Sequence, residues 1–304
     1  MIHKLRAWVR LSRPPFHSVG LLPFILGGAL ACRHGYRFNC TRFAWGAVGV
    51  VLIMLATYYA GEYWDNTEDT LSGRLGASRF AGGSQVVQSG LLPRHAALWA
   101  SLTSLCLALA VGLLLQFRYR TGPWTLPLGI IGITGGFFYS SRPLRWVTRG
   151  WGELWIALCY GWLPVATAYY LLAGRVATAI HWVALPIALT IFNVILLNEF
   201  PDYDADLAAG KRNLTVRLGR ARAAATYALT AVGSWVGLVL SLWNGAPTRA
   251  LWFSLPFLLL SALLVMLMLQ GRWRERQSLD RLCAANLAVN LGTSAAYVLA
   301  LIVR

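Results

Sequence analysis

Carboxylate side chains are scarce in this sequence. Its 304 residues hold 11 Asp and Glu, and charged residues make up 12% of the chain, whereas soluble domains carry about 25%. Hydrophobic residues account for 57%. This composition excludes an ordinary soluble domain and predicts an all-α, polytopic membrane protein. We expect residues 1–304 to form a single transmembrane domain.

The apolar residues gather in runs that recur along the whole chain. Each run is roughly 16–25 residues long, which is the length that a helix needs to cross a bilayer. We therefore predict nine transmembrane helices, near residues 17–32, 42–61, 92–116, 122–139, 151–172, 179–199, 222–243, 250–270 and 281–303.

The patterns of several common sites are also missing. The five histidines are dispersed and the five cysteines show no metal-ligand spacing, so a His- or Cys-based metal centre is not supported. No Walker-type or dinucleotide-binding signature is present, which argues against a nucleotide site. Cys32 and Cys40 flank one predicted outer loop, where two free thiols are favoured over a disulfide.

The formal net charge of +16 raises the question of a nucleic-acid partner. We expect none, because the 27 Lys and Arg residues lie in short loops between apolar runs rather than on a basic helix or tail. With a cytoplasmic N-terminus, most of them fall on the inner side, as the positive-inside rule requires. We therefore expect an integral protein of the cell membrane, or of the inner membrane in a Gram-negative cell, with its C-terminus outside.

Four of the carboxylates follow the sixth apolar run, in the stretch 198–219. They are Glu199, Asp202, Asp204 and Asp206, and Lys211 and Arg212 come soon after. On a helix that continues the preceding run, Asp202 and Asp206 share one face. Two carboxylates on one face repel each other, and a hard cation such as Mg²⁺, which binds carboxylates together with substrate phosphates, relieves that repulsion.

Four more carboxylates follow the second apolar run. They are Glu62, Asp65, Glu68 and Asp69, and Asp65 and Asp69 repeat the spacing of four. Both acidic clusters start at the predicted inner end of a span and are followed by Gly and basic residues, which indicates a loose internal duplication. A long inner loop near 62–91, rich in Gly and Ser, contains Arg74 and Arg79.

Other polar and aromatic residues lie at the inner ends of the spans or at membrane depth. Tyr63 is either part of an aromatic belt at the membrane surface or part of a cage of ring faces beside the acidic cluster. Asn193 either joins helices by hydrogen bonds or belongs to a functional site. Tyr139, Arg142 and Asn198 are further candidates.

Two carboxylate clusters with cations nearby suit a diphosphate held through Mg²⁺, since the metal makes diphosphate a good leaving group. A cavity that opens to the bilayer would accept a hydrocarbon tail, because each buried CH₂ contributes about 0.8 kcal/mol. We therefore expect a central cavity open to the cytoplasmic side and to the bilayer. Its substrate would be an amphiphile with a diphosphate head.

These residues resemble the motifs of the UbiA superfamily of intramembrane prenyltransferases, which have nine transmembrane helices and two motifs, NDxxDxxxD and DxxxD. The second motif stands intact as Asp202 to Asp206, within NEFPDYDADLAAGKRNLTVRLG. In the first, Gly61 replaces the leading Asn and Glu62 replaces an Asp. The segments LSRPPF and FFYSSRPLRW extend the resemblance over most of the chain.

The stretch AGGSQVVQSGLLP and the context of the second motif are most similar to the menaquinone branch of the superfamily. Members of that branch prenylate 1,4-dihydroxy-2-naphthoate. The resemblance thus implies Mg²⁺ as cofactor, and a polyprenyl diphosphate and an aromatic acceptor as substrates, with membrane lipid around the chain. A terpene cyclase on the same fold and a non-catalytic transporter or lipid-binding protein remain as alternatives.

The charge pattern and the resemblance together assign roles to individual residues. The predicted catalytic residues are Asp65, Asp69, Asp202 and Asp206. The predicted metal ligands are Glu62, Asp65, Asp69, Asp202 and Asp206. The predicted diphosphate ligands are Arg74, Arg79, Lys211, Arg212 and Tyr139. Contact with the acceptor or stabilisation of a carbocation is predicted for Tyr63, Asn193, Asn198 and Arg142.

Overall fold

The computed structural model describes residues 2–76 and 78–303. Within these residues, all of the regular secondary structure is helical, and turns and loops join the helices. This confirms the predicted all-α class. The helices are α1 (Ile2–Leu11), α2 (His17–Arg33), α3 (Cys40–Trp64), α4 (Asn66–Gly76), α5 (Arg94–Leu113), α6 (Thr125–Ser140), α7 (Gly152–Ala157), α8 (Leu163–Ala173), α9 (Thr178–Ala208), α10 (Leu214–Leu218), α11 (Arg220–Trp243), α12 (Arg249–Leu269) and α13 (Arg276–Ile302).

Eight helical segments of the described residues are long and apolar enough to cross a bilayer. Two of them contain a turn of π-helix, at Leu114–Arg118 after α5 and at Leu158–Trp162 between α7 and α8. The predicted fourth span corresponds to α6, which is apolar but only 16 residues long. The structure thus supports eight of the nine predicted spans by length. The predicted fourth span is the exception, because it forms a shorter apolar helix.

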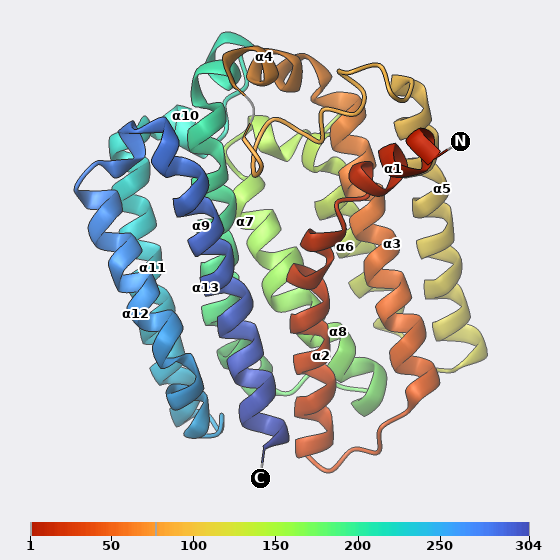
Figure 1. The fold of residues 1–304 in the computed structure, drawn as a ribbon. Helices are drawn as coiled ribbons and strands as arrows, with labels where there is room; N and C mark the ends of the chain where they lie inside the picture. The colour runs from red at the N-terminus through yellow and green to blue at the C-terminus, as the bar shows by residue number, and fades with distance from the viewer. Residues whose placement is uncertain (1, 77, 304) are drawn as a thin grey trace.

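The long helices stand side by side as a bundle, and α4 and α10 lie across one of its ends (Figure 1). Within the bundle, α3 packs along α5, α9 packs along α11, and α13 contacts α2, α9 and α12. The N-terminal helix α1 packs against α3 toward the same end, whereas α13 finishes at the opposite end (Figure 1). The end that carries α4 and α10 is called the motif end below, because both acidic clusters lie there.

Small residues let the helices approach closely in the middle of the bundle. A Cβ atom on Gly27 of α2 would lie 2.1 Å from the carbonyl oxygen of Val165 in α8. A Cβ atom on Gly161 would lie 2.4 Å from the Cα atom of Ala188 in α9. Such contacts are the usual basis of helix association in lipid, where apolar side chains gain little from leaving the lipid.

Large apolar side chains cover the outside of the bundle instead of its interior alone. On α11 and α12, Leu229, Trp252 and Leu259 are 72%, 71% and 64% exposed. A surface of this kind suits contact with lipid tails rather than water. Together with the apolar helices, it makes the chain an integral membrane protein.

Two segments differ from the predicted arrangement. The inner loop predicted near 62–91 begins with helix α4, because Asp69 N–H continues the helical bonding to the Asp65 carbonyl oxygen at 2.9 Å. The sixth span was predicted to end near 199, but α9 continues to Ala208. This extension carries the second acidic motif as a helix, as the spacing of its aspartates predicts.

The distribution of basic residues predicts that the motif end faces the cytoplasm. In a variant without native cysteines, Leu75→Cys and Leu207→Cys should react with a membrane-impermeant thiol reagent only from the cytoplasmic side. Both positions are exposed at the motif end, at 52% and 56%. Arg37→Cys, in the exposed loop after α2, is the matched control and should react only from outside. Labelling with the opposite pattern would contradict the predicted orientation.

Candidate active site

The two acidic clusters converge on one cavity at the motif end of the bundle. The cavity has a volume of about 210 Å³, and its lining includes residues at the motif end of α3, α6 and α9. Its lining includes Asp65 and Asp69 from the first cluster and Asp202 and Asp206 from the second. All four predicted catalytic carboxylates therefore meet in one place, although about 130 residues separate the two motifs in the chain.

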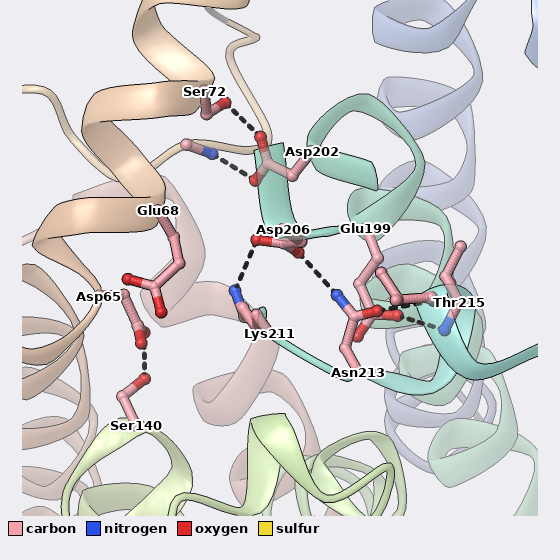
Figure 2. A network of polar contacts seen from close by, with 12 residues as sticks. Asp65, Glu68, Ser72, Ser140, Glu199, Asp202, Asp206, Lys211, Asn213 and Thr215 are labelled. Carbon is pink, nitrogen blue, oxygen red and sulfur yellow. Dashed lines mark hydrogen bonds and ion pairs between the residues drawn. The ribbon is translucent and has the colours of Figure 1, made fainter. Parts of the chain in front are cut away.

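Asp202 and Asp206 lie on the face of α9 that is turned to the cavity (Figure 2). Asp202 accepts hydrogen bonds from the Ser72 hydroxyl of α4 and from Gly82 N–H, the latter at 2.7 Å. The second motif thereby holds the glycine-rich segment that follows α4. Asp204 points away, is exposed, and pairs with Arg220 at 2.8 Å.

Asp206 is held from two sides. Its Oδ1 atom lies 3.3 Å from Lys211 Nζ, and its Oδ2 atom accepts a hydrogen bond from Asn213 Nδ2 at 2.7 Å. Burial alone would lower the pKa of Lys211, but the charges of Asp206 and Asp65 raise it well above its ordinary value. Lys211 therefore stays protonated and lies between the two acidic clusters (Figure 2).

The first cluster is organised by an arginine that the sequence analysis did not select. Arg145 Nη2 lies 3.0 Å from Asp65 Oδ1 and 2.8 Å from Glu68 Oε1. The second oxygen of Asp65 accepts a hydrogen bond from the Ser140 hydroxyl at the end of α6 (Figure 2). Arg142, which was predicted to contact the acceptor or stabilise a carbocation, is exposed and does not line the cavity.

Asp69 completes the carboxylates around the cavity. Burial, together with the negative charges of Asp65 and Glu62, raises the pKa of Asp69 well above its usual range. The local charge is thus more negative than Lys211 and Arg145 can balance. An additional cation in the cavity would lower the free energy of the ionised carboxylates.

Glu62 is one of the two residues that depart from the motif and was predicted to be a metal ligand. It does not line the cavity. Its Oε1 atom accepts hydrogen bonds from Arg13 Nη2 at 2.9 Å and from Ser84 N–H at 2.7 Å. It thereby ties the N-terminal segment to the glycine-rich segment. Gly61 does line the cavity, and a Cβ atom there would come no closer than 3.8 Å to a neighbour, the Ser140 hydroxyl.

Several other predicted site residues lie outside the cavity lining. Arg74, Arg79 and Arg212 are on the exposed surface, where their charges are solvated. Tyr63 stacks against the Arg94 guanidinium at 4.3 Å, which agrees with its interpretation as a membrane-surface aromatic. Asn193 is buried and donates to the Tyr227 carbonyl oxygen of α11 at 3.1 Å, so it joins helices.

Aromatic side chains also line the cavity. Tyr139 and Asn198, both predicted, line the cavity together with Tyr58 and Tyr160, which were not predicted as site residues. The Tyr58 hydroxyl donates to the Phe16 carbonyl oxygen at 3.4 Å. Tyr58 belongs to the aromatic cluster at the end of the predicted second span, and that cluster is the sequence feature that could have indicated Tyr58 as a site residue. Tyr160 comes from the middle of an apolar run and gave none.

The donor set of the cavity fits a hard divalent cation. No group of three or more His, Cys, Asp and Glu side chains within the described residues is close enough to hold a metal ion without adjustment. The groups that converge are nevertheless carboxylate oxygens, from α4, from α9 and from Asp65 between α3 and α4, with neither thiol nor imidazole among them. Mg²⁺ binds through one or two carboxylates and completes its shell with water and substrate phosphates.

Comparison with known proteins identifies the family. Residues 21–291, which include both acidic motifs, match the UbiA prenyltransferase family. The chain belongs to this family. Its relatives include the 1,4-dihydroxy-2-naphthoate octaprenyltransferase of Mycobacterium tuberculosis, which is 32% identical over 77% of this chain and 78% of that protein. The octaprenyltransferase of the same name from Escherichia coli is 27% identical over 87% and 84%.

Solved structures show that this UbiA chain shares the fold of its archaeal homologues. The apo structure of a UbiA homologue from Aeropyrum pernix has a TM-score of 0.66 at 19% identity and covers 92% of this chain and 96% of that one. A homologue from Archaeoglobus fulgidus, bound to GPP and Mg²⁺, has a TM-score of 0.62 at 17% identity, with 95% and 99% covered.

Asn substitutions on the two faces of the second motif in this UbiA chain test whether only the cavity-facing aspartates are needed for turnover. Asp202→Asn and Asp206→Asn should each lower turnover by about 100-fold or more, because each removes a charge aimed into the cavity. Asp204→Asn is the matched control and should keep most of the activity, since Asp204 is exposed and bound to Arg220. Equal losses in all three variants, measured as kcat with a prenyl diphosphate and Mg²⁺, would contradict the role of the shared face.

Proposed function

We propose that this chain transfers a polyprenyl group from an allylic diphosphate to an aromatic acceptor such as 1,4-dihydroxy-2-naphthoate, with Mg²⁺ as cofactor. Such a reaction is a step of quinone biosynthesis. One observation carries the proposal: a carboxylate-lined cavity at the motif end adjoins an apolar cavity within the bundle. Their order matches a diphosphate head followed by a hydrocarbon tail.

The polar cavity supplies groups for the diphosphate head. Asp65, Asp69, Asp202 and Asp206 would hold Mg²⁺. The homologue from Archaeoglobus fulgidus that was solved with GPP and Mg²⁺ supports the choice of metal. When bound, Mg²⁺ would neutralise the phosphates and improve the leaving group. Lys211 adds a fixed positive charge beside Asp206, where negative charge accumulates on the departing diphosphate.

The apolar cavity supplies room for the tail. It has a volume of about 90 Å³ and is lined by residues of α2, α3, α5, α6 and α8, including Ile53, Leu128 and Leu163. Thr57 and Tyr160 line both cavities and therefore mark the junction between them. Each buried methylene of a tail contributes about 0.8 kcal/mol, so this cavity favours isoprenoid over short substrates.

The chemistry at the junction follows from this order. The bond between the allylic C1 carbon and the diphosphate oxygen breaks, and the electron pair leaves with the diphosphate. The ring faces of Tyr58, Tyr139 and Tyr160 line the space around C1, where they can stabilise an allylic cation. A carbon of the electron-rich ring then forms the new bond. With a carboxylated acceptor that bonds at the carboxylate-bearing carbon, loss of CO₂ restores the aromatic ring.

Two alternatives differ in what they require of the cavity. A terpene cyclase would use the same carboxylates and tail cavity but no aromatic acceptor. A transporter or lipid-binding protein would not explain why four aspartates meet Lys211 in one cavity. The naphthoate octaprenyltransferases among the relatives support transfer to an acceptor.

Product analysis with a radiolabelled prenyl diphosphate tests the proposed reaction directly. The purified chain in vesicles with Mg²⁺ should form a prenylated aromatic only when 1,4-dihydroxy-2-naphthoate is present. Chelation of the metal should abolish the product, and restored Mg²⁺ should recover it. Release of a cyclic hydrocarbon without the acceptor would support the cyclase, and intact diphosphate under all conditions would contradict both enzymes.

The tail cavity predicts a way to shorten the accepted chain. Gly129 of α6 lines this cavity, and a Cβ atom placed there meets nothing within 4 Å. Gly129→Phe should exclude the distal part of a long tail, at a cost of about 0.8 kcal/mol for each methylene that loses its contacts. The preferred donor should shift from long polyprenyl diphosphates toward geranyl diphosphate.

Gly129→Ala is the control for that substitution, because it changes helix propensity while adding only one methyl group. Its chain-length profile, measured as kcat/KM over donors of increasing length, should match that of the parent chain. If Gly129→Phe lowers turnover equally for short and long donors, the tail does not occupy this cavity.

A further inference from the structure

A second pair of buried acids lies beside the predicted metal ligands, and one of the two, Glu199, lines the cavity. Glu153 stands in the first turn of α7 and is fully buried, and Glu199 stands on α9 and is 7% exposed. One oxygen of each carboxyl accepts a backbone hydrogen bond at the start of α10. Leu214 N–H donates to Glu153 Oε1 at 2.8 Å, and Thr215 N–H donates to Glu199 Oε2 at 3.1 Å.

The second oxygen of each carboxyl group lacks a donor in the described part of the chain. Glu153 Oε2 and Glu199 Oε1 are buried and accept no hydrogen bond from any donor of the described residues. The two carboxyl groups lie within hydrogen-bonding reach of each other. Within the described residues, neither forms an ion pair with Lys, Arg or His, although every other buried carboxylate cluster here has such a partner.

This arrangement is satisfied when the pair holds one proton. Two adjacent carboxylates away from water, without a cation, repel each other strongly and cannot both remain ionised. One shared proton removes a charge and turns the two unpartnered acceptors into a hydrogen bond. The remaining negative charge is met by the two backbone N–H groups at the start of α10.

The start of α10 is also what holds Asp206. Asn213 caps this helix, since its Oδ1 atom accepts from Val216 N–H at 2.9 Å. The same side chain donates through Nδ2 to Asp206 Oδ2 at 2.7 Å (Figure 2). Glu153 and Glu199 thus anchor the two residues that directly follow Asn213, and a shift there would move the amide that orients Asp206.

We propose that Glu153 and Glu199 share one proton and act as a positioning pair for the cavity carboxylate Asp206. Neither acid is a metal ligand in this scheme, although Glu199 also lines the cavity. The pair connects α7 and α9 to α10, and α10 connects through Asn213 to Asp206. The effect of the pair on Mg²⁺ affinity rests on the proposed function, whereas the shared proton does not depend on that function.

The shared proton has a spectroscopic signature that no purely structural role would produce. The infrared spectrum of the detergent-solubilised protein at pH 7 should contain the C=O stretch of a protonated carboxyl group. Both Glu199→Gln and Glu153→Gln should lower the intensity of that band, because a Gln amide can donate the hydrogen bond that the proton supplied. A protonated Asp69 would contribute to the same band and should do so equally in the parent chain and in both variants. Glu275→Gln is the matched control, since Glu275 is exposed and paired with Arg272 at 2.9 Å. Unchanged band intensity in both single variants would overturn the proposal.

The double variant tests how the pair acts. In Glu153→Gln/Glu199→Gln, both amide oxygens can still accept from α10, but two NH₂ groups then face each other without an acceptor. The Mg²⁺ concentration for half-maximal binding of geranyl diphosphate should rise about threefold or less in each single variant and about tenfold or more in the double variant. A double variant no worse than the product of the single effects would overturn the proposal.

Asn213→Ala tests the connection to Asp206. It should raise the Mg²⁺ requirement, and adding Glu199→Ala to it should raise the requirement no further, because both substitutions interrupt one path. Multiplying effects would place Glu199 on another path and overturn the positioning role. Thermal unfolding and the infrared band are measured on the same variants and need no activity. If geranyl diphosphate does not bind to the parent chain at all, the proposed function fails. The infrared band still tests the shared proton in that case.

Discussion

Concentrated negative charge at the end of an apolar bundle is the constraint on which the rest of the site depends. Carboxylates that are removed from water are costly unless cations or hydrogen bonds compensate them. The structure compensates each one differently: Lys211 for Asp206, Arg145 for Asp65 and Glu68, and Arg13 for Glu62. The compensation is incomplete at Asp69, and that deficit is what a divalent cation would fill.

The elements between the spans exist largely to hold these charges. The short helix α4 brings Ser72 to Asp202, and the glycine-rich segment after it brings Gly82 N–H to the same carboxylate. The segment after α9 brings Lys211 and Asn213 back to Asp206. Each acidic motif is therefore fastened by residues distant from it in the chain or just beyond its own helix.

How much the sequence could predict depends on whether a feature is local. The shared face of Asp202 and Asp206 follows from helical periodicity, and α9 confirms the helix on which they lie. The apolar spans follow from composition in the same way. Arg145 could not be found, because its backbone adopts a positive φ of 42° after α6 and so turns a loop residue toward Asp65. Asn193 was left open since a polar residue at membrane depth serves a site or a helix contact equally well.

The two departures from the family motif have connected physical consequences. Glu62 is engaged by Arg13 and by Ser84 N–H, so its charge fastens the glycine-rich segment instead of facing the cavity. The free space at Gly61 lies on the cavity side of the same helical turn. A metal ion in this chain would accordingly depend on Asp65 and Asp69 alone from the first motif, and Asp202 and Asp206 would carry a larger share of its binding. Such an unequal division would account for the many contacts that hold the second motif, from Ser72, Gly82, Lys211 and Asn213.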